Sequence, residues 1–235
     1  MQGKLIVFEG VEGSGKTTQL RYLQDWLQTT EVENILGVEV GGVPPIMVTR
    51  EPGGTELGFK LRQLLLEPQF ADPIAPEAEL LLYAADRAQH VEGCLKPHLH
   101  QGYLVVCDRY TDSTVAYQGY GRGLSLPLID QLNQIATGGL TSDVTLWLDV
   151  AAEVGLARTQ KRGKADRMEA ADLAFHQRVE QGFNALYAQY PERIVRIDAN
   201  QPPMAIAQHI QAVLTPLLTQ WFPTPLRPLL GKLKP

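Results

Sequence analysis

The chain has 235 residues, of which 44% are hydrophobic and 20% are charged, and its formal net charge is −5. This length predicts one large α/β domain with a full hydrophobic core. The negative charge and the lack of any run of lysines or arginines weigh against duplex DNA as a partner, so we expect no nucleic acid. No apolar stretch of the sequence is long enough to span a bilayer, so we expect no membrane partner.

The two cysteines, Cys94 and Cys107, are far apart in the sequence and form no C-x-x-C motif. Such cysteines are typical of buried thiols rather than of a disulfide framework. The chain opens directly with an apolar segment and a Gly-rich loop rather than with a signal peptide. We therefore expect a cytoplasmic protein in a reducing compartment.

The first predicted element is a buried strand over 4–10, and a helix is expected after residue 18 because leucines recur there at helical spacing. Between them, GVEGSGKTT (10–18) has the Gly-x4-Gly-Lys-Thr spacing of the Walker A P-loop. Backbone N–H groups and the helix N-terminus bind nucleotide phosphates in such a loop. A Gly-rich turn with an incidental lysine is the alternative, and the flanking strand and helix weigh against it.

The P-loop predicts a site for ATP and Mg²⁺. Lys16 is expected to reach the β- and γ-phosphate oxygens, and Thr17 is expected to bind the metal ion. The predicted nucleotide-binding residues of the loop are Gly10, Val11, Glu12, Gly13, Ser14, Gly15, Lys16, Thr17 and Thr18. The loop contains one acid and no second base, so the further positive charge that phosphoryl transfer needs must come from another segment.

The remaining elements alternate between strands and helices. Segment 29–45, with three glycines and two adjacent prolines, is predicted to be an exposed connection. Strands are expected at 46–49, 103–108, 143–150 and 193–198, and helices at 57–65, 76–99, 126–136, 175–190 and 204–218. This alternation predicts a three-layer α/β domain, in which helices cover both faces of a parallel sheet. We expect the domain to span 1–215, followed by a Pro-rich tail (216–235) that either packs on the domain or forms a loose end.

Charged side chains follow two of the predicted strands, in the segments TREPGGT and CDRY. Ligands gather at the carboxyl ends of parallel strands, so Asp108 is a candidate to organise a metal ion or water, and Arg50 and Arg109 are candidate phosphate ligands. A structural ion pair is the alternative for CDRY. TREPGGT can also be read as a helix-entry turn with Thr55 as N-cap.

In LLYAADR, Tyr83 and Arg87 are four residues apart and therefore share a helical face. An aromatic ring and a guanidinium on one face can stack on a base and bind its edge. Periodicity alone favours the alternative, a core tyrosine and a surface arginine.

The segment RTQKRGKADR contains the five basic residues Arg158, Lys161, Arg162, Lys164 and Arg167. It is predicted to be a mobile lid, at about 158–168, that closes over ATP and excludes water. The alternative is a solvated helix end, the usual meaning of a charge run.

The P-loop, TREPGGT, LLYAADR, CDRY, AYQGYGRG and the basic segment occur in this order between about residues 4 and 214. Together they closely resemble the thymidylate kinases, a family of P-loop nucleoside monophosphate kinases. The resemblance implies transfer of the γ-phosphate of ATP to dTMP with Mg²⁺, giving dTDP for dTTP synthesis and DNA replication. It also implies a five-stranded parallel sheet flanked by helices, and a homodimer.

The resemblance also implies which residues hold dTMP. Arg50 and Arg109 would bind the acceptor phosphate, and Glu12 would lie near the sugar 3′-OH. Tyr83 occupies the position of the aromatic side chain that stacks on thymine, and Arg87 that of the arginine that binds the thymine edge. The predicted substrate-binding residues are Arg50, Tyr83, Arg87, Asp108, Arg109, Ser113, Tyr117 and Gln118, and the predicted metal ligands are Thr17 and Asp108.

Tyr117 and Gln118 match the stretch that closes on sugar and base, DANQ (198–201) resembles the adenine-side turn, and Arg158 is expected on the ATP side. Two features depart from the family pattern: segment 29–45 is longer than usual, and the Pro-rich tail has no counterpart.

Some family members carry an arginine within the P-loop, at the position where this chain has Gly13. Members that resemble this sequence have their catalytic arginine in the lid instead, where Arg162 is the best match and Arg158 and Arg167 are the alternatives. The predicted catalytic residues are Lys16, Arg162, Glu12 and Arg109.

Two rival functions follow from the same motifs. One rival is a kinase of another acceptor, either a deoxynucleoside or a different monophosphate. A nucleoside kinase would act on a neutral hydroxyl and would need a base, whereas the phosphate of dTMP is largely dianionic at pH 7 and is already a nucleophile. A P-loop GTPase or partition-type ATPase would only hydrolyse nucleotide, and the guanine-reading N-K-x-D motif does not occur in the sequence. An assay of phosphate acceptors separates these possibilities.

Overall fold

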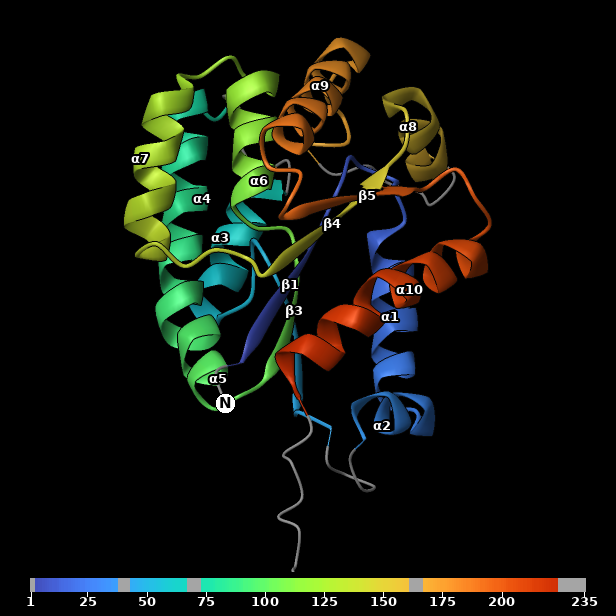
Figure 1. Ribbon diagram of the computed structural model, residues 1–235. Helices are drawn as coiled ribbons and strands as arrows, with labels where there is room; N and C mark the ends of the chain where they lie inside the picture. The colour runs from blue at the N-terminus through green and yellow to red at the C-terminus, as the bar shows by residue number, and fades with distance from the viewer. Residues whose placement is uncertain (1–2, 38–42, 67–72, 161–166, 224–235) are drawn as a thin grey trace, which may run out of the picture.

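The computed structural model describes residues 3–37, 43–66, 73–160 and 167–223. Its centre is a five-stranded sheet with the order β2-β3-β1-β4-β5, in which every neighbouring pair is parallel (Figure 1). The strands are β1 (Lys4–Glu9), β2 (Ile46–Arg50), β3 (Leu104–Asp108), β4 (Val144–Asp149) and β5 (Ile194–Asp198). The fold class and all five strands predicted from apolar runs are therefore confirmed.

Helices cover both faces of this sheet, with α3, α4, α5 and α7 on one side and α1, α2 and α10 on the other (Figure 1). The helices are α1 (Lys16–Leu27), α2 (Thr30–Leu36), α3 (Glu56–Leu66), α4 (Pro76–His90), α5 (Lys96–His100), α6 (Thr111–Thr114), α7 (Leu126–Thr137), α8 (Ala152–Gln160), α9 (Leu173–Gln189) and α10 (Pro203–Trp221). Two π-helical segments, η1 (Val91–Leu95) and η2 (Val115–Gly121), continue α4 and α6. The long helix predicted over 76–99 is thus present, with a π-helical stretch inside it.

The central strand shows how the sequence produces three layers. Side chains alternate between the faces of a strand, so a strand buried on both faces needs an unbroken apolar run. In β1, Ile6 and Phe8 belong to the core under α1 and α10, while Leu5 and Val7 belong to a second core under η1 and α5. All four side chains are fully buried.

Residues 30–36 of segment 29–45 form α2 rather than the connection that the glycines and prolines predict, and residues 38–42 lie outside the described residues. Val32 and Leu36, four residues apart, are buried against α1 and α10, and Gly37 ends the helix in the left-handed region. Two apolar residues at helical spacing are a weak signal for a helix in a segment with so many turn residues. Here tertiary packing outweighs the turn-forming composition.

The last helix was predicted to end at Leu218, and it ends at Trp221. Pro216 lies inside α10, so the predicted boundary between residues 215 and 216 falls within this helix. Proline removes one helical hydrogen bond, but Leu214 and Leu218 on either side of it are buried in the core and hold the helix there. The rest of the predicted tail, 224–235, lies outside the described residues.

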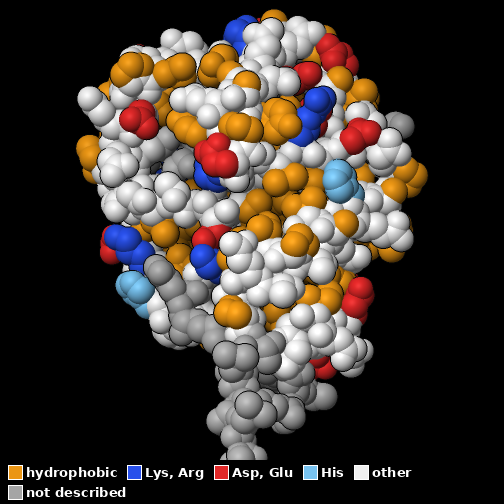
Figure 2. All heavy atoms as spheres, in the orientation of Figure 1, with side chains coloured by type: hydrophobic (Ala, Val, Ile, Leu, Met, Phe, Trp, Pro, Cys, Tyr) orange, Lys and Arg blue, Asp and Glu red, His pale blue; other side chains and the backbone are white. Residues whose placement is uncertain are grey.

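The molecular surface mixes side chains of all kinds. On the face in Figure 2, lysine and arginine side chains are scattered among apolar and acidic ones. Every helix in the described part of the chain is too short or too polar to cross a bilayer.

Candidate active site

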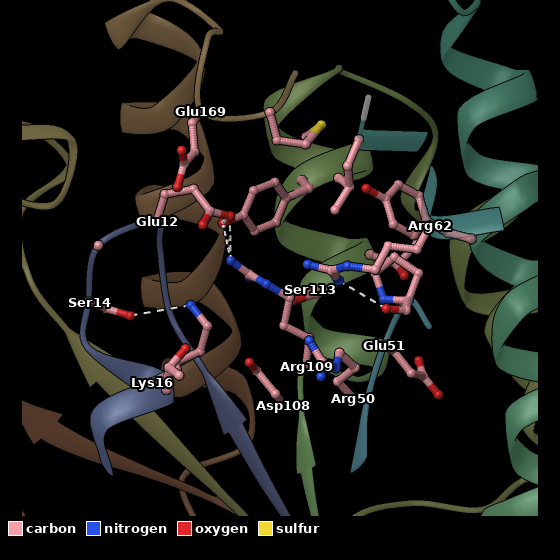
Figure 3. A pocket seen from close by; sticks show the side chains of 18 of the residues that line it. Glu12, Ser14, Lys16, Arg50, Glu51, Arg62, Asp108, Arg109, Ser113 and Glu169 are labelled. Atoms are coloured by element: carbon pink, nitrogen blue, oxygen red, sulfur yellow. Dashed lines mark hydrogen bonds and ion pairs between the residues drawn. The ribbon is translucent and has the colours of Figure 1, made fainter. Parts of the chain in front are cut away.

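A cavity of about 430 Å³ opens where the P-loop meets the carboxyl ends of β2 and β3 (Figure 3). It is lined by nearly all of the residues that sequence analysis predicted: Glu12, Gly13, Ser14, Gly15, Lys16, Thr17, Thr18, Arg50, Tyr83, Arg87, Asp108, Arg109, Ser113, Tyr117, Gln118 and Arg158. Gly10 and Val11 are not part of this lining. Arg162, Lys161 and Lys164 lie outside the described residues.

The P-loop bends around the side chain of Lys16. The lysine Nζ donates hydrogen bonds to the carbonyl oxygens of Gly10 at 2.9 Å and Val11 at 3.1 Å, and to Ser14 Oγ at 3.4 Å. Burial and the nearby charge of Arg109 lower the pKa of Lys16 to about 8. The lysine is therefore held inside the loop by carbonyl groups, which phosphate oxygens can replace as acceptors.

Gly13 explains why this P-loop carries no arginine. Its φ of +71° lies in the left-handed region, and a Cβ there would stand 2.0 Å from the carbonyl oxygen of Gly155 on α8. Any side chain at this position would collide with backbone, which cannot yield as a flexible side chain would. In this chain, additional positive charge must reach the cavity from another segment.

Arg109 and Glu12 form an ion pair across the mouth of the P-loop (Figure 3). Arg109 also donates to Tyr117 Oη at 3.0 Å and to Ser113 Oγ at 3.1 Å, and Tyr117 Oη donates to Glu12 at 3.0 Å. Burial alone would raise the pKa of Glu12, but the charges of Arg109 and Lys16 lower it to about 2. The structural ion pair considered for CDRY therefore exists, with Glu12 rather than Asp108 as the partner of Arg109.

Glu9, at the end of β1, is a residue that sequence analysis missed. Its fully buried carboxyl group accepts hydrogen bonds from Tyr110 N at 2.8 Å and from the backbone and hydroxyl of Ser113 at 3.1 and 2.6 Å. Burial and the neighbouring Asp112 raise the pKa of Glu9 to about 7. An acid that ends a buried strand beside a P-loop is the same signal that identified Asp108, and it could have found Glu9.

Asp108 and Arg50 pair in register at the ends of β3 and β2, so both side chains reach the cavity. The Oδ1 atom of Asp108 is buried and has no hydrogen-bond partner among the described residues. Thr17 also lines the cavity. Thr55 is also the N-cap that TREPGGT predicted, because Gly58 N donates to Thr55 Oγ1 at 3.0 Å.

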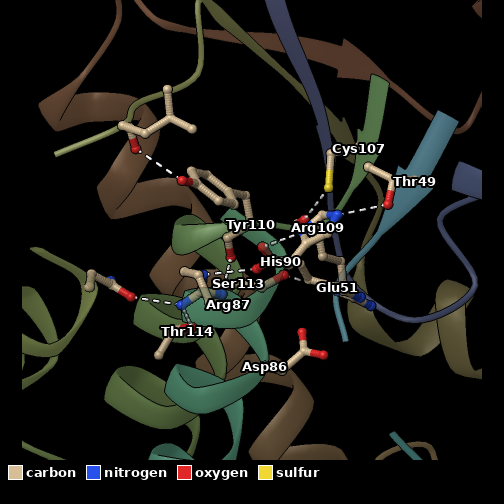
Figure 4. Close-up of polar contacts among 12 residues, drawn as sticks. Thr49, Glu51, Asp86, Arg87, His90, Cys107, Arg109, Tyr110, Ser113 and Thr114 are labelled. Atoms are coloured by element: carbon tan, nitrogen blue, oxygen red, sulfur yellow. Dashed lines mark hydrogen bonds and ion pairs between the residues drawn. The ribbon is translucent and has the colours of Figure 1, made fainter. Parts of the chain in front are cut away.

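Arg87 is not the surface arginine that periodicity favoured, since only 2% of it is exposed. Its guanidinium donates to Glu51 at 2.8 Å, Thr114 and Asn133 at 2.7 Å each, and the Tyr110 carbonyl at 2.9 Å (Figure 4). A guanidinium has five N–H donors, so these four bonds leave one N–H for a ligand. The arginine is part of the cavity wall, and it also links α4 to the residue after β2, to α6 and to α7.

Glu51 joins Arg87 to a second buried group, His90, whose Nδ1 lies 2.9 Å from the other Glu51 oxygen. The Nε2 atom of His90 lies 2.7 Å from Thr49 Oγ1 (Figure 4). Burial alone would lower the pKa of His90, but hydrogen bonding to Cys94 and Glu51 raises it to about 9. Glu51 is therefore held between two cationic groups.

The two ends of the basic segment have separate contacts. Arg158, at the end of α8, donates to the carbonyl of Ala199 at 3.1 Å, which brings it to the DANQ turn. Arg167 forms an ion pair with Glu79 on α4 and donates through Nε to the carbonyl of Leu65 on α3. The first contact joins Arg158 to the turn that the resemblance assigns to adenine, and the second contact involves Glu79, one helical turn before Tyr83.

Comparisons with known proteins identify the family of this chain. The family profile described as "Thymidylate kinase" matches residues 8–210. A thymidylate kinase of a Cyanothece strain is 59% identical over 95% of this chain and 98% of the relative, and that of Acaryochloris marina is 57% identical over 95% and 100%. A crystal structure of thymidylate kinase from Ehrlichia chaffeensis superposes with a TM-score of 0.70 at 32% identity, covering 91% of this chain and all of the other. The chain belongs to the thymidylate kinase family.

Proposed function

We propose that the chain transfers the γ-phosphoryl group of ATP to dTMP, giving dTDP, in the cavity at the carboxyl edge of the sheet. The observation that carries this proposal is that the P-loop, two arginines at strand ends and the Tyr83–Arg87 face of α4 line one cavity. A nucleotide hydrolase would need the P-loop, but it would not need the two strand-end arginines or the Tyr83–Arg87 face. The relatives named above are thymidylate kinases, and their similarity to this chain extends over nearly their whole length.

The P-loop binds the donor. Its backbone N–H groups and the N-terminus of α1 hold the phosphates of ATP, and Lys16 turns from the loop carbonyls to the β- and γ-phosphate oxygens. The donor set also fits Mg²⁺, because the unpartnered Asp108 Oδ1 and the Thr17 hydroxyl are oxygen ligands, and Mg²⁺ is usually held by one or two protein oxygens plus phosphates and water. Asp108 and Thr17 would hold the ion, which would supply positive charge to offset the charge of the phosphates.

The acceptor side brings a second anion toward the first. The phosphate of dTMP, with a second pKa near ~6, is largely dianionic at pH 7 and needs no catalytic base. Arg50 and Arg109 hold it, and the Glu12–Arg109 pair fixes the guanidinium before the substrate arrives. Catalysis is therefore mainly charge neutralisation and alignment.

The remaining charge comes from Arg162 in the basic segment, because the Gly13–Gly155 contact excludes an arginine from the P-loop. The base is held on α4, where Tyr83 stacks on the ring and the remaining N–H of Arg87 donates to O4 of thymine. Cytosine has an amino donor at that position, so dCMP would place donor against donor.

The homodimer is proposed on the face of α3, α4 and α7. Large apolar side chains are exposed there at Leu57, Phe59, Leu64, Leu81, Leu126, Leu128 and Ile135. Ile135 is 78% exposed, and a cluster of this kind on neighbouring helices fits a second copy of the chain. Sedimentation should give a dimer mass that Ile135→Glu shifts toward the monomer. A monomer at all concentrations would contradict this interface.

The protein is also proposed to act in the cytoplasm, because its two cysteines are free and buried, as is typical of proteins in a reducing compartment.

A coupled ADP-release assay with ATP, Mg²⁺ and a panel of nucleosides and nucleoside monophosphates tests the proposed reaction. ADP formation should depend on dTMP and should be absent with thymidine. ADP release that no monophosphate stimulates would favour a nucleotide hydrolase and overturn the proposal.

A further inference from the structure

Glu79, which the sequence analysis did not single out, lies one helical turn before Tyr83 on α4. Its side chain is fully buried. It accepts hydrogen bonds from Gln118 Nε2 at 2.9 Å and from Arg122 Nε and Nη2 at 3.2 Å each, and it forms an ion pair with Arg167. One carboxylate thus receives donors from η2, from the residue after η2, and from the residues before α9.

The carboxyl group of Glu79 is ionised. Burial alone would raise its pKa, but hydrogen bonds from Arg122 and Gln118 and the charges of two arginines lower it. An ionised carboxylate can only accept hydrogen bonds. The side-chain amide of Gln118 must therefore turn its NH₂ group toward Glu79, which leaves its carbonyl oxygen at the other end.

This orientation has a consequence for the ligand, because Gln118 lines the cavity beside Tyr83. A free glutamine could offer either its NH₂ donor or its carbonyl acceptor to a base. Pyrimidines differ in hydrogen bonding at N3: thymine and uracil carry a donor N–H there, whereas N3 of cytosine is an acceptor. A glutamine fixed with its carbonyl outward favours the first kind of base.

We propose that Glu79 is a positioning residue that fixes the Gln118 amide with its carbonyl oxygen toward the acceptor, so that the site selects a pyrimidine with an N3–H group. This inference rests on the proposed function and deepens it. Arg122 and Arg167 keep the carboxylate ionised and in place, and Arg122 is itself held over the ring of Phe175 at 4.6 Å. Selectivity therefore depends on a residue that need not touch the substrate.

Glu79→Gln tests the inference, because the new amide has nearly the same size but can offer a donor or an acceptor to Gln118. The KM for dTMP should rise about tenfold while kcat stays within about threefold, and the ratio of kcat/KM for dTMP to that for dCMP should fall about tenfold. Asp112→Asn is the matched control: Asp112 is also a buried carboxylate paired with an arginine, Arg193, and it does not line the cavity. It should keep the dTMP/dCMP ratio of the unaltered protein.

A double-mutant cycle separates positioning from a general loss of structure. Gln118→Met removes the amide, so adding Glu79→Gln to it should change the dTMP/dCMP ratio no further. Thermal unfolding shows whether each variant is folded. An unchanged dTMP/dCMP ratio in a folded Glu79→Gln variant would overturn the role of Glu79. So would an equal fall in this ratio when Glu79→Gln is added to the unaltered protein and to Gln118→Met. A protein that phosphorylates no dTMP would overturn the proposed function itself.

Discussion

The donor half and the acceptor half of the cavity are built in different ways. On the donor side, nine consecutive residues form the loop whose backbone we propose to bind phosphates, and Lys16 donates hydrogen bonds to two carbonyl oxygens of the same loop. On the acceptor side, buried charged side chains from distant segments hold one another, as Glu51 holds Arg87 and Glu12 holds Arg109. The donor half is therefore local structure, whereas the acceptor half exists only once the whole domain has folded.

The sharpest test of the donor half concerns the charge that its loop lacks. Arg162→Ala should lower kcat about 10³-fold with a much smaller change in the KM for dTMP, because the arginine acts on transition-state charge. Steady-state kinetics with saturating ATP measures both constants. A normal kcat would shift the role to Arg158 or Arg167, both of which are present in the described structure.

On the acceptor side, a single buried arginine is expected to matter for stability as well as for binding. Arg87→Ala leaves Glu51 without its guanidinium partner and should lower the free energy of unfolding by about 3–5 kcal/mol. It should also reduce kcat/KM for dTMP more than for dCMP. Arg196→Ala is the control, because this arginine is 55% exposed in its pair with Asp149 and should cost less than about 1 kcal/mol. Equal losses of unfolding free energy in the two variants would contradict the greater importance of the buried ion pair.

Close backbone packing is the weak point of the donor half. In Gly155→Ala, the new methyl group would lie 2.2 Å from the carbonyl oxygen of Glu12. The P-loop must move, which should cost about 1–3 kcal/mol of stability and raise the KM for ATP. Gly93→Ala is the matched control, since its methyl group would meet only the flexible end of Gln89 at 3.1 Å. That variant should unfold at the same temperature or higher.

The acceptor half should also respond to pH through His90. Its pKa is raised to about 9 in the folded protein, above the ordinary value of 6.5. A raised pKa gives stability that is complete below about pH 6.5 and is lost as the pH rises through about 9. The free energy of unfolding should fall by about 1 kcal/mol between about pH 8 and 9.5. Denaturant titrations should show this slope removed in His90→Asn and kept in the exposed control His100→Asn. The same slope in both variants would assign it to other groups.

The contrast between the halves also explains what sequence could predict. The P-loop, the five strands and the strand-end residues Arg50 and Asp108 are specified by neighbours in the chain, and the structure has them where they were expected. The hydrogen bonds and ion pairs between distant charged side chains on the acceptor side were not predictable in this way. Glu79 has no local motif, and its partner Gln118 lies 39 positions away. Glu9 ends a strand as Asp108 does, but its partner Ser113 lies 104 positions away and could not be read from the neighbouring sequence. Helix α2 was missed for the same reason, because packing rather than local composition stabilises it.

We propose that one cavity holds ATP and dTMP together and that a phosphoryl group passes between them there. Incubation with ATP labelled at the γ-phosphate, followed by separation of products, tests it directly. Label should appear in dTDP, with dUMP used within one or two decades of dTMP because the lost methyl is worth about 1 kcal/mol, and with dCMP far behind. Label released as inorganic phosphate at the same rate with or without a monophosphate would contradict the account.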